Sequence, residues 1–510
     1  MKNSLNEAMA LAGQNMLLCL NKDCHYLPYW LLEVSEDYRA HFHFYRSVHN
    51  IGRWWDCLLR LEQATGFMIP AELEAKMLDN FQMYMNNEDH LATEPEEIVT
   101  DRDIRFDVHS IRETLMALCA LIEHRNSIWA KETAYEVVRA ADRLVCEDGS
   151  LDFGCLHYYK DQILSEDYLN WETPIHSHGR IIEPLVYYYK LTGDELAYQL
   201  AERLAHWHFE NSTTSTGTLA GLKKINHAHS YLGTLRGLLL FGKLSGQHKY
   251  VERVRRCYDQ AVMREMIKDS GFSAHDVGAD ASPEPATAGD AAQLALWLAL
   301  EGYPVYLDDA EKLIRCRLLP SMVWKTPPIL PDGEGNEDRY ADLSLRILGA
   351  FGGVQTKPHG GKRSTIDVTA SCLHTLTDIY NHIVVREQNI TRVFFHFDYT
   401  DNDITVRSVR ENGRAIITIE SSRPGVLMVR VPNWTPSESL RVTYNAEQVD
   451  IPVKDGFVTV PSGQVVVSFD LPVREIIERT DGTDYRIRFS GDEITGILPN
   501  TTFYPFYPDL

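Results

Sequence analysis

Four acidic residues cluster in one segment of the chain that has the composition of a loop. Residues 273–290 contain Asp276, Asp280, Glu284 and Asp290 among Gly, Ala and Pro residues, directly before the apolar run AAQLALWLALEG. Cleavage of a glycosidic bond usually needs one carboxylic acid to protonate the leaving oxygen and a second group as nucleophile or base. Each acid could equally serve a turn or a helix cap. We assign Asp276, Glu284 and Asp290 to catalysis.

Histidines stand at the start of two further apolar helices. Glu172, His176 and His178 lie in WETPIHSHGR, before IIEPLVYYYKLTG, and His227 and His229 lie in NHAH, before YLGTLRGLLLFGKLSG. Imidazole and carboxylate groups at such places could transfer protons or bind sugar hydroxyls. A single histidine there is often only a hydrogen-bonded structural residue. We assign His227 to catalysis and the other four residues to substrate binding.

These histidines give little support for a bound metal. His176 and His178 are two residues apart, but no second cluster with a fixed ligand spacing accompanies them. Zinc sites usually take three or four side-chain ligands. We therefore expect no metal and no other cofactor.

Two adjacent tryptophans, Trp54 and Trp55, stand between Arg53 and Asp56. Aromatic rings can stack on the C–H face of a sugar ring, and the flanking charges could bind its hydroxyls. Alternatively, one tryptophan belongs to the core and Arg53 pairs with Asp56. We expect Trp54, Trp55 and Asp56 to bind substrate. A later charged stretch, residues 101–113, is more simply interpreted as capping and charged residues at the N-terminus of a helix.

Helical spacing of apolar residues dominates the chain up to about residue 390. A Gly-containing connection recurs between the helices, and Gly193, Gly246 and Gly302 lie 53 and 56 residues apart. A helix hairpin of this length cannot bury both faces alone, so its copies must stack. About six copies fit, which favours closure into an (α/α)6 barrel at residues 1–390 with its long loops on one face. That face is the expected place for a site.

After Asn389 the pattern changes to alternating apolar and polar residues, as in AIITIES and QVVVSFD, with Asn-Gly, Ser-Gly and Asp-Gly turns. This pattern is typical of short antiparallel strands. We expect residues 391–510 to form a β-sandwich domain that supports the barrel. The overall fold class is therefore α+β, multidomain.

Charge and composition limit the partners of the chain. The formal net charge is −22, which opposes binding to nucleic acid and to anionic membranes. No apolar run approaches the ~18 residues of a membrane span, and the N-terminus lacks the pattern of a signal peptide. We expect a cytoplasmic protein, or a mature form whose leader was removed. A homo-oligomer is left open.

Three segments, in the same order, resemble glycoside hydrolase family 127, the bacterial β-L-arabinofuranosidases. GRIIEPLVYYYKLTG resembles the family pattern GHLIEAAVAYYEATG, and NHAH resembles its GHAVR helix start. LMVRVPNW, RVTYNAEQV and VVVSFDLPVR resemble its tail of LRLRIPGWA, a VNG turn and a strand ending in MPVR. The resemblance runs from about residue 165 onward and implies an (α/α)6 barrel that cleaves sugars.

Most of the zinc and nucleophile residues of that family are missing, although its glutamate is matched by Glu284. Its E-x-C motif falls on EPA at 284–286, and its Cys-Cys-Pro motif falls on SCL at 371–373. Ser371 therefore stands at the position of the nucleophile, and only Cys372 remains. One cysteine cannot form a zinc site of three thiolates and a carboxylate. The resemblance supports the fold and the sugar chemistry but not that mechanism.

The leading expectation is a glycoside hydrolase that releases a terminal sugar from an oligosaccharide or glycoconjugate. Paired carboxylates would do the chemistry without zinc, or His227 and Cys372 would act by an altered covalent route. Cys372 and His359 join the expected substrate-binding residues. The alternatives are a polysaccharide lyase acting on a uronate-containing glycan, which the negative charge disfavours, and a sugar-binding protein without activity.

Overall fold

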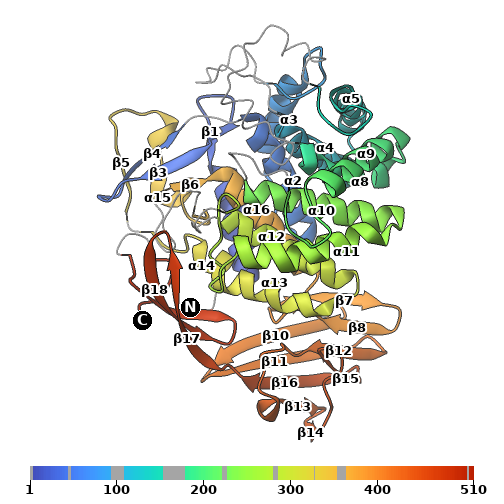
Figure 1. The fold of residues 1–510 in the computed structure, drawn as a ribbon. Helices are drawn as coiled ribbons and strands as arrows, with labels where there is room; N and C mark the ends of the chain where they lie inside the picture. Colours follow the sequence, from blue (N-terminus) through green and yellow to red (C-terminus); the bar gives the residue numbers. More distant parts are fainter. Residues whose placement is uncertain are drawn as a thin grey trace.

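The computed structural model describes the chain with several gaps. The described residues are 4–43, 47–93, 108–152, 178–220, 227–278, 285–326, 328–352, 363–501 and 505–510. Within them, helices occupy most of the part before residue 382 and strands the part after it (Figure 1).

Six inner helices form a closed ring. They are α2 (Ser47–Thr65), α4 (Ser110–Arg125), α8 (Ile182–Thr192), α10 (Ala228–Ser245), α12 (Pro285–Leu300) and α16 (Ile366–Asn381). Each inner helix contacts the next one along the chain, and α16 contacts α2, which closes the ring. Most residues of the inner helices are buried, and α10 and α12 in particular are apolar almost all round.

Outer helices alternate with the inner ones and complete the hairpins. They are α1 (Leu5–Leu18), α3 (Ala71–Met85), α5 (Ile128–Leu144), α9 (Glu195–Asn211), α11 (His248–Cys257) with the π-helix η3 (Tyr258–Met266), and α13 (Leu307–Leu313) with the π-helix η5 (Ile314–Leu318) and α14 (Leu319–Ser321). The predicted (α/α)6 barrel is confirmed.

Connections from an inner to an outer helix are short. At two of them Gly193 and Gly246 end the inner helix with φ of 72° and 68°, which a residue with a side chain rarely adopts. Asp194 then caps α9 by accepting from the backbone N–H groups of Leu196 and Ala197. Connections from an outer to an inner helix are much longer, so they gather at the end of the barrel where the inner helices begin.

Two of these long connections contain a sheet that the helical pattern did not predict. Its strands are β3 (Leu31–Val34), β4 (Arg39–His43), β5 (Leu330–Pro331) and β6 (Arg363–Thr365), in the order β5-β4-β3-β6. A two-stranded sheet of β1 (Leu20–Asn21) and β2 (Leu27–Pro28) precedes it. The connection before α16 also contains η6 (Asp338–Tyr340) and α15 (Leu343–Arg346), and η2 (His178–Ile181) lies directly before α8.

The C-terminal part consists of three sheets. One has six strands in the order β14-β13-β16-β11-β10-β9, and another has four in the order β15-β12-β8-β7. Their bounds are β7 Val384–Glu387, β8 Ile390–Val393, β9 Tyr399–Thr400, β10 Ile404–Glu411, β11 Arg414–Ser421, β12 Val426–Arg430, β13 Arg441–Tyr444, β14 Glu447–Val449, β15 Phe457–Pro461 and β16 Gln464–Asp470. The predicted β-sandwich is confirmed, with one departure: β8 and β12 pair in parallel.

The third sheet packs against the barrel. Its strands are β17 (Val473–Thr480), β18 (Thr483–Ser490) and β19 (Glu493–Leu498). Tyr485, Ile487 and Phe489 of β18 form a small buried cluster with Phe272 and Cys316 of the helical part.

A buried ion cluster also joins the barrel to the sandwich. Glu311 of α13 accepts from Arg315 at 2.8 Å and contacts Arg430 of β12. Burial raises the pKa of Glu311, but Arg315 and Arg430 outweigh it and hold the pKa well below its usual value. A buried carboxylate of the barrel thus pairs with an arginine of the sandwich.

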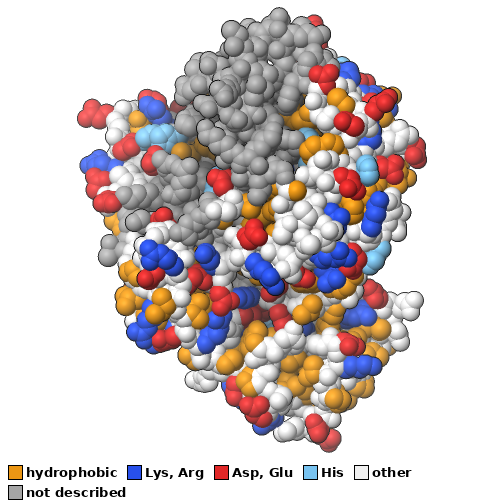
Figure 2. All heavy atoms as spheres, viewed as in Figure 1, with side chains coloured by type: hydrophobic (Ala, Val, Ile, Leu, Met, Phe, Trp, Pro, Cys, Tyr) orange, Lys and Arg blue, Asp and Glu red, His pale blue; other side chains and the backbone are white. Residues whose placement is uncertain are grey.

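The described surface carries charges of both signs. On the face shown in Figure 2, Lys and Arg are interspersed with Asp and Glu, and hydrophobic side chains show over the C-terminal strands. No helix among the described residues is both long and apolar enough to cross a membrane.

Candidate active site

The inner helices all begin at the same end of the barrel, which we call the mouth. Glu113, in the first turn of α4, lies 3.3 Å from Arg53 of α2 and 2.8 Å from Arg180 of η2. At the opposite end, the last turns of the inner helices line a cavity of about 320 Å³; its polar residues include Gln63, Lys190, Lys243, Glu301 and His382. The long connections therefore lie over the mouth.

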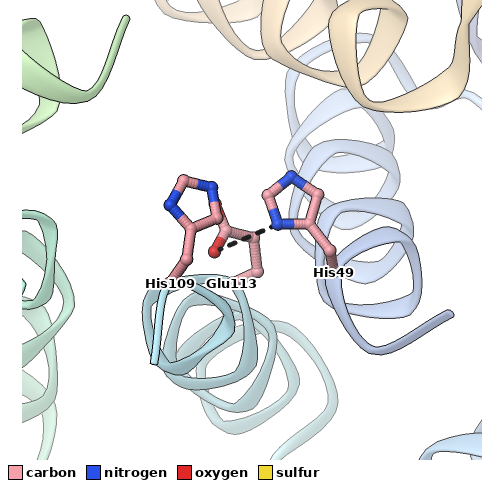
Figure 3. A group of neighbouring side chains, drawn as sticks. All are labelled: His49, His109 and Glu113. Atoms are coloured by element: carbon pink, nitrogen blue, oxygen red, sulfur yellow. Dashed lines mark ion pairs between the residues drawn. The ribbon is translucent and has the colours of Figure 1, made fainter. Parts of the chain in front are cut away.

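A cluster around Glu113 occupies the base of the mouth (Figure 3). Arg180 donates from Nη2 to Oε1 of Glu113, and Arg53 donates from Nε to Nε2 of His49 at 2.9 Å. Nδ1 of His49 faces Oε2 of Glu113 at 3.7 Å. The rings of His49 and His109 lie 4.9 Å apart and nearly parallel, and Arg180 also contacts the nitrogens of His109.

Electrostatics fix the charge states in this cluster. Burial raises the pKa of Glu113, but Arg180, His49 and Arg53 outweigh it, so the pKa falls well below its usual value. Burial lowers the pKa of His49, against the opposing effect of Glu113. Burial also lowers the pKa of Arg180 to about 9, which leaves it protonated at neutral pH. At neutral pH the cluster therefore contains an ionised carboxylate, neutral His49 and charged guanidinium groups.

Asp290 and His229 form a second pair next to this cluster. Oδ2 of Asp290 contacts Nδ1 of His229, and Oδ1 accepts from Arg236. Nε2 of His229 lies 3.0 Å from Arg53 and 3.4 Å from Arg180. Because guanidinium groups can only donate, Nε2 is the acceptor and the proton of neutral His229 sits on Nδ1, toward Asp290.

The pKa values agree with this arrangement. Burial raises the pKa of Asp290, but Arg236 and His229 outweigh it and hold the pKa far below its usual value. Burial lowers the pKa of His229 to about 4, although Asp290 opposes the shift. Asp290 is therefore ionised at neutral pH and cannot act as a proton donor.

A second charged layer closes the barrel axis below the mouth. Glu183 accepts from Arg112 and Arg236, each at 3.1 Å. Asp56 lies in this layer, 2.7 Å from Arg60. Burial raises the pKa of Asp56, but Arg60 outweighs it and the pKa falls to about 2. These groups neutralise one another across the barrel axis.

At the outer side of the mouth, His227, His275 and Asp276 form a rim group. A backbone bridge joins His227 to Asp276, and the backbone N–H of Ala228 donates to the carbonyl of His275 at 2.8 Å. Nδ1 of His275 lies 3.3 Å from Asp276, whose side chain is 41% exposed. The ring of His227 lies 5.6 Å from that of His229. The rim group therefore places a partly exposed acid, Asp276, near the buried pair of His229 and Asp290.

The structure brings several predicted residues together. His227 and Asp276 meet at the rim, and His229 and Asp290 meet below it. His178 is fully buried and shares a hydrogen bond of 2.9 Å with His208. Five further candidates lie outside the described residues: Glu172, His176, Asp280, Glu284 and His359.

The prediction that Trp54 and Trp55 form a sugar platform is wrong. Both are 0% exposed, and Trp54 donates from Nε1 to the carbonyl of Met16 on α1. Because α2 is an inner helix with neighbours on several sides, two successive side chains, about 100° apart around the helix, are both covered. The assignment of Asp56 and Cys372 to substrate contact is also wrong, because Asp56 is paired in the second layer and Cys372 is fully buried in α16.

The strongest site residues were not assigned from the sequence. His49 and Arg53, and likewise His109 and Glu113, are four residues apart, so each pair shares one helix face. Arg236 is an isolated charge inside the apolar run YLGTLRGLLLFG. Polar residues at helical spacing on otherwise apolar inner helices were the signal that could have identified them.

Comparison with known proteins yields matches in structure only. No protein-family model matches the chain, and no curated protein matches it. A solved structure of a GH127 β-L-arabinofuranosidase from Geobacillus stearothermophilus is similar over 89% of this chain and 77% of its own, with 14% identity and a TM-score of 0.57. Another GH127 β-arabinofuranosidase covers 87% and 74%, with 11% identity and a TM-score of 0.58. A structure described as a glycoside hydrolase covers 88% and 77%, with 14% identity and a TM-score of 0.56. At these identities the likeness concerns the fold.

Proposed function

We propose that this protein hydrolyses glycosidic bonds and releases a terminal sugar from an oligosaccharide or glycoconjugate. The observation that carries the proposal is the contrast between two aspartates at one barrel mouth. Asp290 is buried and held ionised by Arg236, whereas Asp276 is partly exposed at the rim. Carboxyl groups in contrasting environments are the usual arrangement for dividing acid and base roles in glycosidases.

In this proposal Asp276 and His227 transfer the proton to the leaving oxygen, because both are partly exposed at the rim. Asp290, held by His229, supplies the negative charge on the other side of the sugar. His229 contributes to hydroxyl recognition, whereas His178 is fully buried against His208 and supports the site from behind. The fold shared with sugar-cleaving enzymes supports the reaction class by analogy.

The charged layer across the barrel axis supports release of a terminal sugar. Arg112, Glu183 and Arg236 pair with one another on the axis below the mouth. A polysaccharide could not pass along an axis closed in this way, so we propose that the end of a sugar chain binds at the mouth. Ser371 at the position of the family's nucleophile leaves no thiolate there, so we propose carboxylate chemistry in its place.

The test is a panel of nitrophenyl glycosides and of plant and microbial oligosaccharides, followed by release of nitrophenol and of reducing monosaccharide. Monosaccharide as the first product from an oligosaccharide supports the proposal. Larger fragments as first products would contradict terminal release, and no release from any substrate would contradict hydrolysis.

A polysaccharide lyase is the second candidate, and one observation favours it. Arg53, Arg180, His49 and His109 meet at the base of the mouth, and eliminases can use arginine and histidine where hydrolases use paired acids. Elimination creates an unsaturated bond that absorbs in the ultraviolet. An increase in that absorbance without uptake of water would favour the lyase.

A further inference from the structure

Three side chains at the base of the mouth point toward one another from two helices (Figure 3). They are His49 of α2, His109, directly before α4, and Glu113 of α4. One imidazole nitrogen from each histidine and one carboxylate oxygen of Glu113 all lie within 4.8 Å of one another. All three residues are buried. We propose that His49, His109 and Glu113 bind a divalent transition-metal ion of the zinc type.

Two buried atoms in this group lack a hydrogen bond within the described part of the chain. They are Nδ1 of His49 and Oε2 of Glu113, and they face each other at 3.7 Å. Two atoms that each bind one zinc ion at about 2.0–2.2 Å lie about 3.5 Å apart when the geometry is tetrahedral. The separation therefore matches two ligands of one ion better than it matches a direct hydrogen bond.

The ligand types and their charge states fit such an ion. Two imidazoles and one carboxylate, with a position left open, form a common catalytic zinc site. His49 is neutral and Glu113 is ionised at neutral pH, as metal ligands must be. The site on α2 and α4 differs from the zinc position that the resemblance implies, which would fall at residues 284–286 and 371–373.

Two arginines compete with the ion and determine how binding must proceed. Arg53 donates to Nε2 of His49, so the ring proton of neutral His49 sits on Nδ1. A metal at Nδ1 therefore requires the proton to move to Nε2, and Nε2 then loses its hydrogen bond from Arg53. Oδ2 of Asp367, 3.4 Å away, is the acceptor for that proton. Arg53 and Arg180 keep Oε1 of Glu113, at 3.3 and 2.8 Å, while Arg180 turns away from His109.

Because guanidinium contacts must be exchanged for metal bonds, the affinity is lower than that of a preformed structural zinc site. We expect one Zn²⁺ per chain with a Kd of about 1 µM, whereas structural zinc sites bind with Kd values of about 50 nM or lower at pH 7. Any role of the ion in hydrolysis rests on the proposed function, whereas the binding of the ion is independent of it.

The experiment is calorimetric titration of the full chain with ZnCl₂, together with the visible absorption of bound Co²⁺. His49→Gln and His109→Gln should each weaken Zn²⁺ binding by at least about 100-fold, and Asp367→Asn by about 10–100-fold. Arg53→Met removes a competing charge and should tighten binding. The glutamine variants retain most of the side-chain volume, and thermal melting confirms that they fold.

A matched control is available on the surface. His41 of β4 contacts Asp332 at 2.5 Å, and both side chains are partly exposed. His41→Gln removes a histidine–carboxylate pair outside the mouth, so it should leave the Zn²⁺ affinity unchanged. Binding that His41→Gln abolishes and His49→Gln does not would overturn the proposal.

Activity gives a separate outcome. A chelator should reduce hydrolysis and added Zn²⁺ should restore it. Absence of stoichiometric Zn²⁺ binding in both the wild type and Arg53→Met would overturn the metal site and leave the proposed hydrolysis standing. Zn²⁺ binding without turnover on any substrate would support the metal site and contradict the proposed function.

Discussion

His229 and Asp290 contact each other through Nδ1 and Oδ2, from the first turn of α10 and the second turn of the neighbouring helix α12. Two arginines donate to Nε2 of His229, and a third donates to Oδ1 of Asp290. These contacts determine the proton position of the histidine and the charge of the aspartate. His229 presents a fixed tautomer, and Asp290 stays ionised. The predictions below depend on this pairing and on the burial around it.

Asp290→Asn should lower kcat by about 100-fold or more, because the amide cannot supply the negative charge. It also leaves Arg236 without its charged partner, so we expect about 3 kcal/mol of lost stability. Steady-state kinetics and denaturant unfolding measure the two effects. Full turnover in a folded variant would contradict the role of Asp290.

Asp276→Asn should also reduce turnover by about 100-fold, but with little change in the free energy of unfolding, since the side chain is partly exposed. The comparison variant is Asp332→Asn, which removes a partly exposed aspartate beside a histidine on the sheet of β3–β6. Equal turnover in the two variants would argue against proton transfer by Asp276.

Stability should fall as the pH is lowered from about 6.5 to about 4. Burial lowers the pKa of His229 to about 4, so the folded state binds a proton less readily than the unfolded chain does. Protonation of the unfolded chain below about 6.5 therefore favours unfolding, by roughly 3 kcal/mol for this one group once the pH reaches 4. His374 shifts in the same direction.

The check is the melting temperature against pH for wild type and His229→Gln. The variant should have a flatter profile over this range, whereas His206→Gln, at an exposed position on α9, should keep the wild-type slope. A wild-type slope in His229→Gln would contradict the assignment.

Glu311→Gln should destabilise the whole chain by about 3–5 kcal/mol, because it leaves Arg315 and Arg430 buried without their shared carboxylate. Glu387→Gln is the control: its pair with Arg392 is exposed, and its loss should change stability by less than about 1 kcal/mol. Denaturant unfolding followed by fluorescence separates these outcomes.

Trp54→Phe should lower the melting temperature and leave KM unchanged. The substitution removes a buried indole and its hydrogen bond to Met16, at an estimated cost of about 1–3 kcal/mol. A raised KM in a fully stable variant would restore the sugar-platform interpretation that the structure contradicts.

The sequence carried enough information for the barrel and the sandwich. The spacing of the recurring glycines indicates the length of a hairpin, and alternating apolar and polar residues indicate strands. Both patterns can be recognised from the sequence because each depends only on residues close together in the chain. The sheet of β3–β6 could not be foreseen in this way, since its strands are two to five residues long and Arg39 pairs with Leu330. Such pairing depends on how the barrel closes.

The site was predictable in part. Local composition identified His229 because it opens an apolar helix, and Asp290 because it belongs to a cluster of four acids next to one. Glu113 and Arg180 were harder, since a charge near a helix start is commonly only a cap, and their partners are 67 residues away along the chain. The error at Trp54 has the same cause: local sequence does not reveal that α2 has neighbours on several sides.

Ring closure by α16 against α2 also has a consequence for biosynthesis. Asp367 and His49, which meet at 3.4 Å across this seam, belong to the last and the first of the inner helices. A ribosome must therefore deliver more than two-thirds of the chain before the seam can form. Until then the apolar flanks of α2 and of each newly made helix stay unpaired, so we expect the nascent protein to need a chaperone and any product truncated before α16 to aggregate.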